Sequence, residues 1–336
     1  MGLRLLIIKP SSFGDIVHIF PALELIKRYF PDAEADFVVN PEFAGLLEFS
    51  PLPIRKKIIF ERKKLAKAAS FLPEFYRLVR NLRQEKYDYV IDFQGLFRSG
   101  ICTFAARGKI KAGFADCREK SAAFAYNCRF AIGKAHAVER CVRLVQKIFA
   151  LPDEVVPQVT MPVSAAGKAA LPELPANYIV LLPGTRWESK RFPTSLFTGI
   201  SLRIPQLLPG MGIVVAGSKG EKAIADEIGG DPLNLAGITT LESLFELLRN
   251  ASCVIGNDSG PLHAAAALGV PVFGFYGPTL PGLTGPWGDN TVTVSNGCEC
   301  AGCLQRICPL PEQKCHQIDT EKLVAMIVSK IKENQP

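Results

Sequence analysis

The sequence lacks the apolar segments that direct a chain into or across a membrane. No apolar run approaches the roughly 20 residues that a membrane-spanning helix needs. The first nine residues, Met1–Lys9, are too short for a signal peptide, and no small-residue cleavage site follows them. We therefore expect a cytoplasmic protein and interpret Leu3–Ile8 as a first β-strand.

Several catalytic signatures are also missing. The absence of GxxxxGK[ST] excludes a P-loop, and the absence of GxGxxG after a strand argues against a dinucleotide dehydrogenase. No GxSxG turn is present, so Ser259 is not expected to be a hydrolase nucleophile. No Asp-x-Asp pair is available to hold a divalent metal on a nucleotide sugar, and no nucleic-acid-binding motif is visible.

The composition is that of a soluble globular chain of two ordinary domains. The chain has 336 residues, of which 48% are hydrophobic and 21% charged, which excludes a disordered protein. Its net charge of +7 suits an anionic ligand or surface. One basic stretch, Arg55–Lys67, is either a solvated face or a contact for anionic lipid headgroups.

The order of apolar and polar segments repeats in the two halves. Strand-like Leu3–Ile8 and Tyr178–Leu182 each run into a polar, glycine-containing loop and then a helical pattern. Alternating strands and helices predict parallel sheets covered on both faces. The stretch rich in Pro, Ala and Val at 152–175 is interpreted as a linker. We predict two Rossmann-like domains, residues 1–160 and 176–319, that face each other across a cleft, with a final helix in 320–336 packing back on the first domain.

The polar stretch Asn257–His263 lies between a strand, 251–256, and a helix, 264–268. Loops at this position of an α/β domain bind ligands, and the free N–H groups and dipole of the following helix favour an anion. Ser259 and Gly260 are small enough for a ligand to approach the backbone. The plainer alternative is that Asp258 or Ser259 only caps the helix. His263, one turn into the helix, is either a phosphate contact, an orienting partner of Asp258, or a structural histidine.

Other strand-end loops carry further candidate residues. Thr185, Arg186 and Lys190 could hold a diphosphate opposite the N–H groups of Ser259 and Gly260, or form an ordinary exposed loop. Glu221 could accept hydrogen bonds from ribose hydroxyls. In the first half, Asp15 could act as a general base, or cap a helix that begins at Ile16.

Five of the ten cysteines crowd into Cys298–Cys315. Cys300, Cys303, Cys308 and Cys315 could together hold a structural zinc ion or an Fe–S cluster. The alternative is a reduced or disulfide-closed loop. A metal- or redox-sensing protein built on this loop stays open as a different functional class.

Five motifs, in order along nearly the whole chain, resemble those of the lipopolysaccharide heptosyltransferases, glycosyltransferase family 9. They are Lys9–His18 with Phe20–Leu23, Asp92–Ser99, Pro183–Arg186 with Lys190, Asn257–His263, and Tyr276–Thr279 with Gly285–Gly288. The first two motifs are most similar to those of the heptosyltransferases that act first, on Kdo (3-deoxy-D-manno-octulosonic acid).

The resemblance implies a GT-B fold and a metal-independent, inverting transfer of heptose from ADP-heptose to the Kdo or heptose inner core on lipid A. It implies no cofactor for catalysis, no nucleic-acid partner and, at most, peripheral contact with the inner face of the inner membrane. Asp15 matches the proposed base of the family. The donor-site positions are matched by Thr185, Lys190, Glu221, Asp258, Gly260 and His263.

For the acceptor, we expect its anionic sugar to bind the first domain near Arg98, Arg118 and Arg140, beside the loop that carries Lys9 and Ser12. A GT-B transferase that uses another sugar nucleotide remains an alternative.

Overall fold

The computed structural model describes residues 2–153, 156 and 171–333. The chain divides into two compact units, Met1–Val163 and Ser164–Pro336, and each is described by itself. Most of the predicted linker, 154–155 and 157–170, lies outside the described residues, as do residues 334–336 of the last predicted segment. Among the residues described, no helix combines the length and the apolar character needed to cross a bilayer.

The first unit is built on six parallel strands in the order β3-β2-β1-β4-β5-β6. These strands are β1 (Arg4–Ile8), β2 (Glu34–Val39), β3 (Ile54–Ile59), β4 (Lys86–Asp92), β5 (Arg107–Phe114) and β6 (Cys128–Phe130). Ile8 at the end of β1 pairs with Val38 on one side and with Asp92 on the other. The loop after β1 therefore emerges beside the loop after β4.

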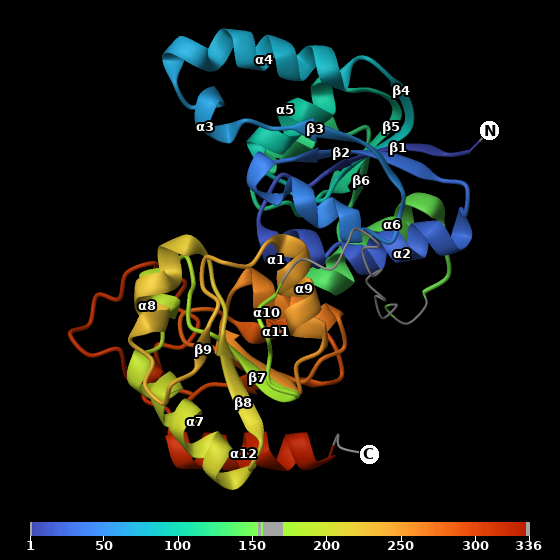
Figure 1. Cartoon of the computed structure of the whole chain (residues 1–336). Helices are drawn as coiled ribbons and strands as arrows, with labels where there is room; N and C mark the ends of the chain where they lie inside the picture. The colour runs from blue at the N-terminus through green and yellow to red at the C-terminus, as the bar shows by residue number, and fades with distance from the viewer. Residues whose placement is uncertain (1, 154–155, 157–170, 334–336) are drawn as a thin grey trace. The chain divides into compact units, whose positions relative to one another are not determined.

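The helices of the first unit cover both faces of this sheet. They are α1 (Phe13–Val17), α2 (Phe20–Tyr29), α3 (Arg62–Leu65), α4 (Ala68–Leu82), α5 (Phe97–Ala105) and α6 (Ala137–Phe149), with the 3₁₀ segments η1 (Pro41–Phe49) and η2 (Lys120–Ala125). Helices α4 and α5 lie on one face, whereas α2 and α6 pack together on the other (Figure 1). Leu78, Leu82 and Cys102 bury the first face against strand residues such as Leu6 and Val90.

The second unit repeats this plan. Its six parallel strands have the order β12-β11-β10-β7-β8-β9, and β10 pairs with both β7 and β11. The strands are β7 (Asn177–Leu182), β8 (Met211–Val215), β9 (Leu233–Asn234), β10 (Cys253–Asn257), β11 (Val272–Phe275) and β12 (Thr291–Val294). Its helices are α7 (Thr194–Leu207), α8 (Lys222–Asp226), α9 (Leu241–Arg249), α10 (Gly260–Ala267), α11 (Pro281–Thr284) and α12 (Thr320–Glu333), with 3₁₀ turns η3 (Glu188–Lys190), η4 (Lys219–Glu221) and η5 (Lys314–His316).

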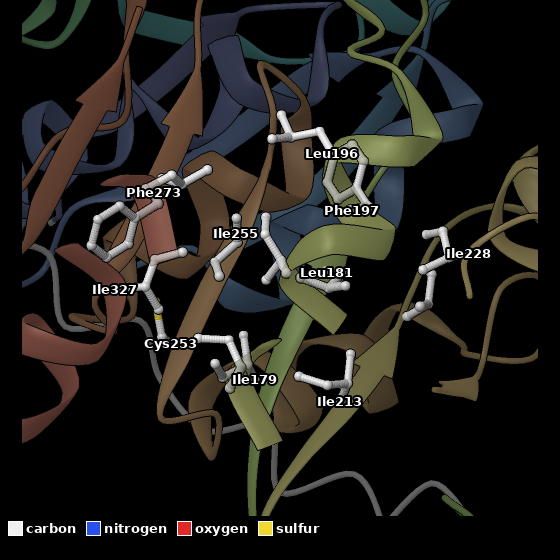
Figure 2. Close-up of a cluster of buried hydrophobic side chains, with 14 of the residues drawn as sticks. Ile179, Leu181, Leu196, Phe197, Ile213, Ile228, Cys253, Ile255, Phe273 and Ile327 are labelled. Carbon is white, nitrogen blue, oxygen red and sulfur yellow. The ribbon is translucent and has the colours of Figure 1, made fainter. Parts of the chain in front are cut away.

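The last helix contributes to the core of the second unit, and its contact with the first unit stays a prediction. Ile327 of α12 is fully buried beside Cys253 and Phe273 (Figure 2). Helix α12 packs along α7, where a side chain on Gly199 would collide with Thr320. The sequence alone showed an amphipathic helix but did not show which apolar surface it would cover.

The basic stretch Arg55–Lys67 contains both structural and exposed residues. Its first part is the edge strand β3, and the remainder is α3 and the turn before α4. Arg55 is anchored there by two hydrogen bonds to the buried carboxylate of Asp36, to which Tyr87 also donates. This part of the stretch is therefore structural, whereas Arg62–Lys64 and Lys67 are exposed.

Candidate functional site

Two adjacent strand ends create the candidate site of the second unit. Gly256 of β10 pairs with Leu182 of β7, so the loops that follow these strands emerge side by side. The buried amide of Asn257 joins them: its Nδ2 donates to the carbonyl of Pro183 at 2.6 Å, and its Oδ1 accepts from the N–H of Phe192 at 3.3 Å. Asn257 thus fixes the backbone from which the polar side chains project.

Asp258 is the centre of a polar network in this unit. Its carboxylate accepts from Lys190 Nζ at 2.6 Å and from Thr279 Oγ1 at 2.8 Å, and it lies 3.3 Å from His263 Nε2. Thr185 Oγ1 donates to the Asp258 carbonyl at 3.0 Å. The structure therefore brings together four residues that the sequence analysis selected, and it places His263 as a partner of Asp258.

The environment keeps Asp258 ionised. Burial by itself raises the pKa of this carboxyl, but the hydrogen bond and charge of His263 and the charge of Lys190 together lower the pKa well below its ordinary value. Only 7% of the Asp258 side chain and 16% of the Lys190 side chain are exposed. An ionised carboxylate in this position orients Lys190 and His263 for a ligand rather than exchanging protons itself.

The N-terminus of α10 lies next to this network. Ser259 is the N-cap residue of α10, although its side chain makes no capping hydrogen bond. The hydroxyl oxygens of Ser259 and Tyr276 are buried and have no hydrogen-bond partner within the described residues. Burial and the negative charge of Asp258 raise the pKa of Tyr276 well above its ordinary value. The unsatisfied Ser259 hydroxyl and the first N–H groups of the helix offer hydrogen-bond donors to an anionic ligand.

Glu221 lies over the start of the loop after β7. Its carboxylate accepts from the N–H of Ser218 at 2.7 Å, and a side chain on Gly184 would overlap it. A side chain at position 184 would therefore displace the end of the Glu221 side chain. Arg186 is exposed, and Lys190 Nζ also lies 4.5 Å from the ring centre of Trp187.

In the first unit, Lys9, Ser12 and Asp15 form a second polar group after β1. Asp15 accepts from the N–H of Ser12 at 2.8 Å and from its hydroxyl at 2.6 Å. Lys9 is buried, donates to the carbonyl of Phe93 at 3.2 Å and lies 3.7 Å from the other Asp15 oxygen. Helix α1 begins at Phe13, so Asp15 is its third residue and not the cap of a helix beginning at Ile16.

Asp15 is ionised at neutral pH and open to solvent. Desolvation raises its pKa, but the charge of Lys9 and the hydrogen bonds from Ser12 lower the pKa to about 2. The side chain is nevertheless 42% exposed, so a substrate hydroxyl can reach it. The same hydrogen bonds stabilise the first turn of α1, and a structural role coexists with any chemical one.

The three arginines predicted to bind the acceptor, Arg98, Arg118 and Arg140, lie on segments of the first unit that contact one another. Glu119 binds Gly95 through its backbone N–H and Phe97 through its carboxylate, which joins the segments carrying Arg98 and Arg118. Both of these arginines are exposed. Arg140 differs, because it is paired with Asp116 at 2.9 Å and its guanidinium lies 4.8 Å from the ring centre of Phe114.

The loop after β4 is held by a buried acid. Asp92 accepts from the N–H groups of Gln94 and Gly95 at 2.8 and 3.1 Å and from the Tyr126 hydroxyl at 2.7 Å. Burial raises the pKa of Asp92 above its ordinary value. The Asp92–Ser99 motif therefore shapes the loop that presents Arg98.

The cysteine-rich loop does not form a recognisable metal centre. Across 2–153, 156 and 171–333, no group of three or more His, Cys, Asp or Glu side chains is arranged to hold a metal ion. Cys300, Cys303, Cys308 and Cys315 are free thiols, as is Cys298, whose sulfur lies 3.5 Å from that of Cys300. The zinc or Fe–S site at these cysteines stays a prediction.

Three residues of the site were not predicted individually from the sequence, namely Asn257, Tyr276 and Thr279. Thr279 lies 21 residues beyond Asp258 and reaches it only because β11 lies next to β10. Tyr276 and Thr279 could have been found from their position, because Tyr276–Thr279 directly follows a buried strand. The loop after β10 was predicted as a site for the same reason. Asn257 was visible as the first polar residue after that strand.

Comparison with known proteins agrees with this architecture. The sequence model of glycosyltransferase family 9 (heptosyltransferase) matches residues 75–314, more than half of the chain. Lipopolysaccharide heptosyltransferase 1 of Pseudomonas aeruginosa is 31% identical over 316 residues, which cover 91% of this chain and 87% of that protein. Lipopolysaccharide heptosyltransferase 1 of Escherichia coli K12 is 30% identical, covering 86% of this chain and 92% of that protein.

Solved structures are similar over the same length. The E. coli heptosyltransferase WaaC with ADP has a TM-score of 0.78 and 27% identity, covering 98% of this chain and all of the other. E. coli ADP-heptose lps heptosyltransferase II has a TM-score of 0.77 at 19% identity, which supports the fold alone. The two parallel sheets and these matches confirm the predicted α/β fold of the GT-B type. The chain therefore belongs to glycosyltransferase family 9 (heptosyltransferase) and is a glycosyltransferase.

Proposed function

We propose that this enzyme transfers heptose from ADP-heptose to the Kdo of the lipopolysaccharide inner core on lipid A. The observation that carries the proposal is the network of Lys190, His263 and Thr279 around ionised Asp258 at the N-terminus of α10. The names of the relatives, and a 27% identical structure solved with ADP, support the choice of donor and of lipopolysaccharide.

The donor binds the second unit in this proposal. Its diphosphate accepts hydrogen bonds from the N–H groups of Ser259 and Gly260, from Thr185 and from Lys190, and Glu221 accepts from the ribose hydroxyls. Arg186, which is exposed, adds positive charge at the edge of the loop. Lys190 and the α10 dipole neutralise the negative charge that develops on the leaving ADP, so the reaction does not require a divalent metal ion.

The acceptor binds the first unit. Arg98 and Arg118 attract the carboxylate of its sugar, and Arg140, held by Asp116, adds to the positive field. Asp15 accepts the proton of the attacking hydroxyl as that oxygen bonds to the anomeric carbon and the bond to ADP breaks. Attack from the face opposite the leaving group inverts the anomeric configuration.

The test is to incubate the protein with Kdo-bearing lipid A and, in separate reactions, ADP-heptose, a UDP-sugar and a GDP-sugar, and to measure release of the nucleotide. Release only from ADP-heptose, unchanged by a metal chelator, supports the proposal. Preferential release from UDP- or GDP-sugars would assign the enzyme to another donor, and loss of activity on chelation would overturn metal independence.

The role of Asp15 is tested separately. Asp15→Asn is expected to lower the turnover number by at least about 100-fold while leaving ADP affinity within about twofold, because the substitution lies outside the donor site. Asp32→Asn, at an exposed position of the same unit, is the matched control and is expected to retain full activity. Wild-type turnover by Asp15→Asn would contradict the assignment of Asp15 as the base.

A further inference from the structure

Ser189 of η3 is held by the cysteine-rich loop and by His316, which directly follows that loop. Its N–H donates to the carbonyl of Arg306 at 3.2 Å, and its hydroxyl donates to the carbonyl of Gln305 at 2.6 Å. Its own carbonyl oxygen lies 2.8 Å from His316 Nε2. All three polar groups of this residue, which is 4% exposed, are therefore bonded to a segment that lies 116 to 127 residues later in the chain.

The imidazole of His316 is placed to donate to Ser189. A carbonyl oxygen only accepts hydrogen bonds, so the nitrogen that faces it, Nε2, carries the hydrogen. The ring stacks on Phe192, with 4.3 Å between the ring centres and 29° between the planes. Phe192 is buried, and its N–H donates to the side chain of Asn257 at 3.3 Å. Buried residues of the core therefore fix the ring in the position from which it donates to Ser189.

The turn η3 is too short to fix its own position. It is a single 3₁₀ turn, closed by backbone bonds from Lys190 to Trp187 at 3.2 Å and from Arg191 to Glu188 at 2.9 Å. The side chain of its N-cap residue, Trp187, makes no capping hydrogen bond. One isolated turn of this kind has little stability by itself. Contacts from outside the turn therefore determine where the Lys190 side chain begins, and those of Ser189 are made by the residue directly before it.

The cysteine-rich loop is also bonded to a second segment that leads to the Asp258 network. The N–H of Leu304 donates to the carbonyl of Pro278 at 2.8 Å. The residue after Pro278 is Thr279, whose hydroxyl donates to the Asp258 carboxylate at 2.8 Å. The loop thus connects the backbone beside Lys190 with the backbone beside Thr279, and both of these side chains bind the same carboxylate.

We propose that Ser189 and His316 are positioning residues for donor binding, because they hold the backbone from which the Lys190 ammonium reaches the diphosphate. The inference rests on the proposed function, in which Lys190 binds that diphosphate. Lysine carries its charge on a flexible four-carbon stem. A cation that is held in place before the ligand arrives loses less conformational entropy on binding. Asp258 holds the end of this side chain at 2.6 Å, and Ser189 and His316 hold its start.

The affinity of the whole protein for ADP, measured by calorimetry, tests this role with two variants of one residue. His316→Phe keeps an aromatic ring on Phe192 but removes the donor, and it should weaken ADP binding about fivefold, the effect of one lost hydrogen bond. His316→Gln loses the ring but keeps an N–H donor, and it should bind ADP within about twofold of the wild type. Gln317→Ala, at the exposed next position, is the control and should bind like the wild type. Wild-type affinity of His316→Phe would overturn the proposal.

A double-mutant cycle separates positioning of Lys190 from a general structural effect. In a Lys190→Met background there is no ammonium to place, so His316→Phe should change ADP affinity by less than about twofold. Ser189→Ala, which removes the bond to Gln305, should behave in the same way, with a loss of about fivefold only when Lys190 is present. Equal losses of affinity in the two backgrounds would show that these residues only stabilise the fold, and would overturn the positioning role.

Amine labelling reports the position of Lys190 without any ligand. The free protein is reductively methylated, and the rate at each lysine is followed by peptide mass spectrometry. His316→Phe should raise the rate at Lys190, whose side chain is 16% exposed, on the order of threefold, because its contact with Asp258 opens more often. Lys222, 58% exposed, is the internal control and should react equally in both proteins.

The labelling result also distinguishes failure of this inference from failure of the proposed function. An unchanged rate at Lys190 in His316→Phe would overturn the positioning role, even if ADP binds to the wild type. Absence of ADP binding by the wild type would instead overturn the proposed donor, while a faster reaction at Lys190 in His316→Phe would still support the hold of His316 on this side chain.

Discussion

Replacing Asp258 by asparagine should destabilise the second unit far more than a similar change at the surface. The Asp258 carboxylate is 7% exposed and lies 2.6 Å from Lys190 Nζ, whereas Asp226 pairs with Lys222 at 2.7 Å with both side chains more than half exposed. Removing one partner of a buried ion pair costs about 3–5 kcal/mol. Because Lys190 keeps some solvent contact and asparagine still accepts hydrogen bonds, we expect a loss of about 2–3 kcal/mol for Asp258→Asn, against less than about 0.5 kcal/mol for Asp226→Asn.

Tryptophan fluorescence during urea unfolding measures this difference in the unfolding free energy of the second unit. Both tryptophans of the chain, Trp187 and Trp287, belong to the second unit, so their signal reports its unfolding. A double-mutant cycle with Lys190→Met should give a coupling energy of about 1.5–3 kcal/mol. Equal unfolding free energies for Asp258→Asn and Asp226→Asn would refute the reasoning.

The pH dependence gives an independent check on the same carboxylate. Because the folded-state pKa of Asp258 is depressed, its contribution to stability is present above the unfolded-state pKa, near 4, and is lost as the pH falls below it. Asp258→Asn should therefore lose less stability than the wild type between neutral pH and about pH 3. An identical acid dependence of the two proteins would contradict the assigned environment.

Four further outcomes are expected. Lys190→Met should weaken ADP binding by about 10- to 100-fold in calorimetry, because the proposed phosphate contact loses its charge; unchanged affinity would remove Lys190 from the donor site. Ile327→Ala should lower the unfolding free energy of the second unit by about 2–4 kcal/mol, measured by the same fluorescence, since Ile327 is fully buried; no change would contradict the placement of α12. Arg55→Met should lower the unfolding free energy by about 2–4 kcal/mol, because buried Asp36 loses its counter-charge and keeps only the hydrogen bond from Tyr87. Lys57→Met, at the exposed pair with Glu48, should cost less than about 0.5 kcal/mol; equal effects on circular-dichroism melts would refute this. Lys9→Met should raise the pKa of Asp15 from about 2 towards its ordinary value in a carboxyl NMR titration; an unchanged pKa would show that Lys9 is not its cause.

The sequence was sufficient to predict the repeated strand–loop–helix plan, because buried parallel strands are continuous apolar runs and polar loops follow them directly. Edge strands carry a weaker signal. Strand β3 has three consecutive cations, Arg55–Lys57, and was interpreted as a basic stretch. At this edge of the sheet Arg55 has a buried counter-charge in Asp36 of the neighbouring strand, 19 residues earlier in the chain.

The loops of the candidate site could be predicted from the sequence, but the contacts between their side chains could not. The loop after β10 was identified from local polarity, yet the register of β7, β10 and β11 decides that Lys190 and Thr279 reach Asp258. Similarly, Arg140 was selected from the sequence as an acceptor-binding residue, and only the fold reveals Asp116 as its partner. Long-range pairing of this kind has no signature in a single sequence.

The metal site predicted for the cysteine-rich loop rests on the spacing of its ligands. Cys300 and Cys303 have the separation of many zinc ligands, but the side chains needed to complete a tetrahedral site must converge from a loop whose path the sequence does not determine. In the described residues no three such side chains are arranged to hold a metal ion, and the site stays a prediction. Ligand spacing predicts a metal site only when the backbone between the ligand pairs is itself constrained.

The most direct test of the account is the mass of the acceptor after incubation with ADP-heptose. Kdo-bearing lipid A should gain one heptose residue for each ADP released, in the presence of a metal chelator. Asp15→Asn should release ADP at least about 100-fold more slowly than the wild type while still binding ADP. An acceptor of unchanged mass with the wild-type enzyme, or heptose addition by Asp15→Asn at the wild-type rate, would contradict it.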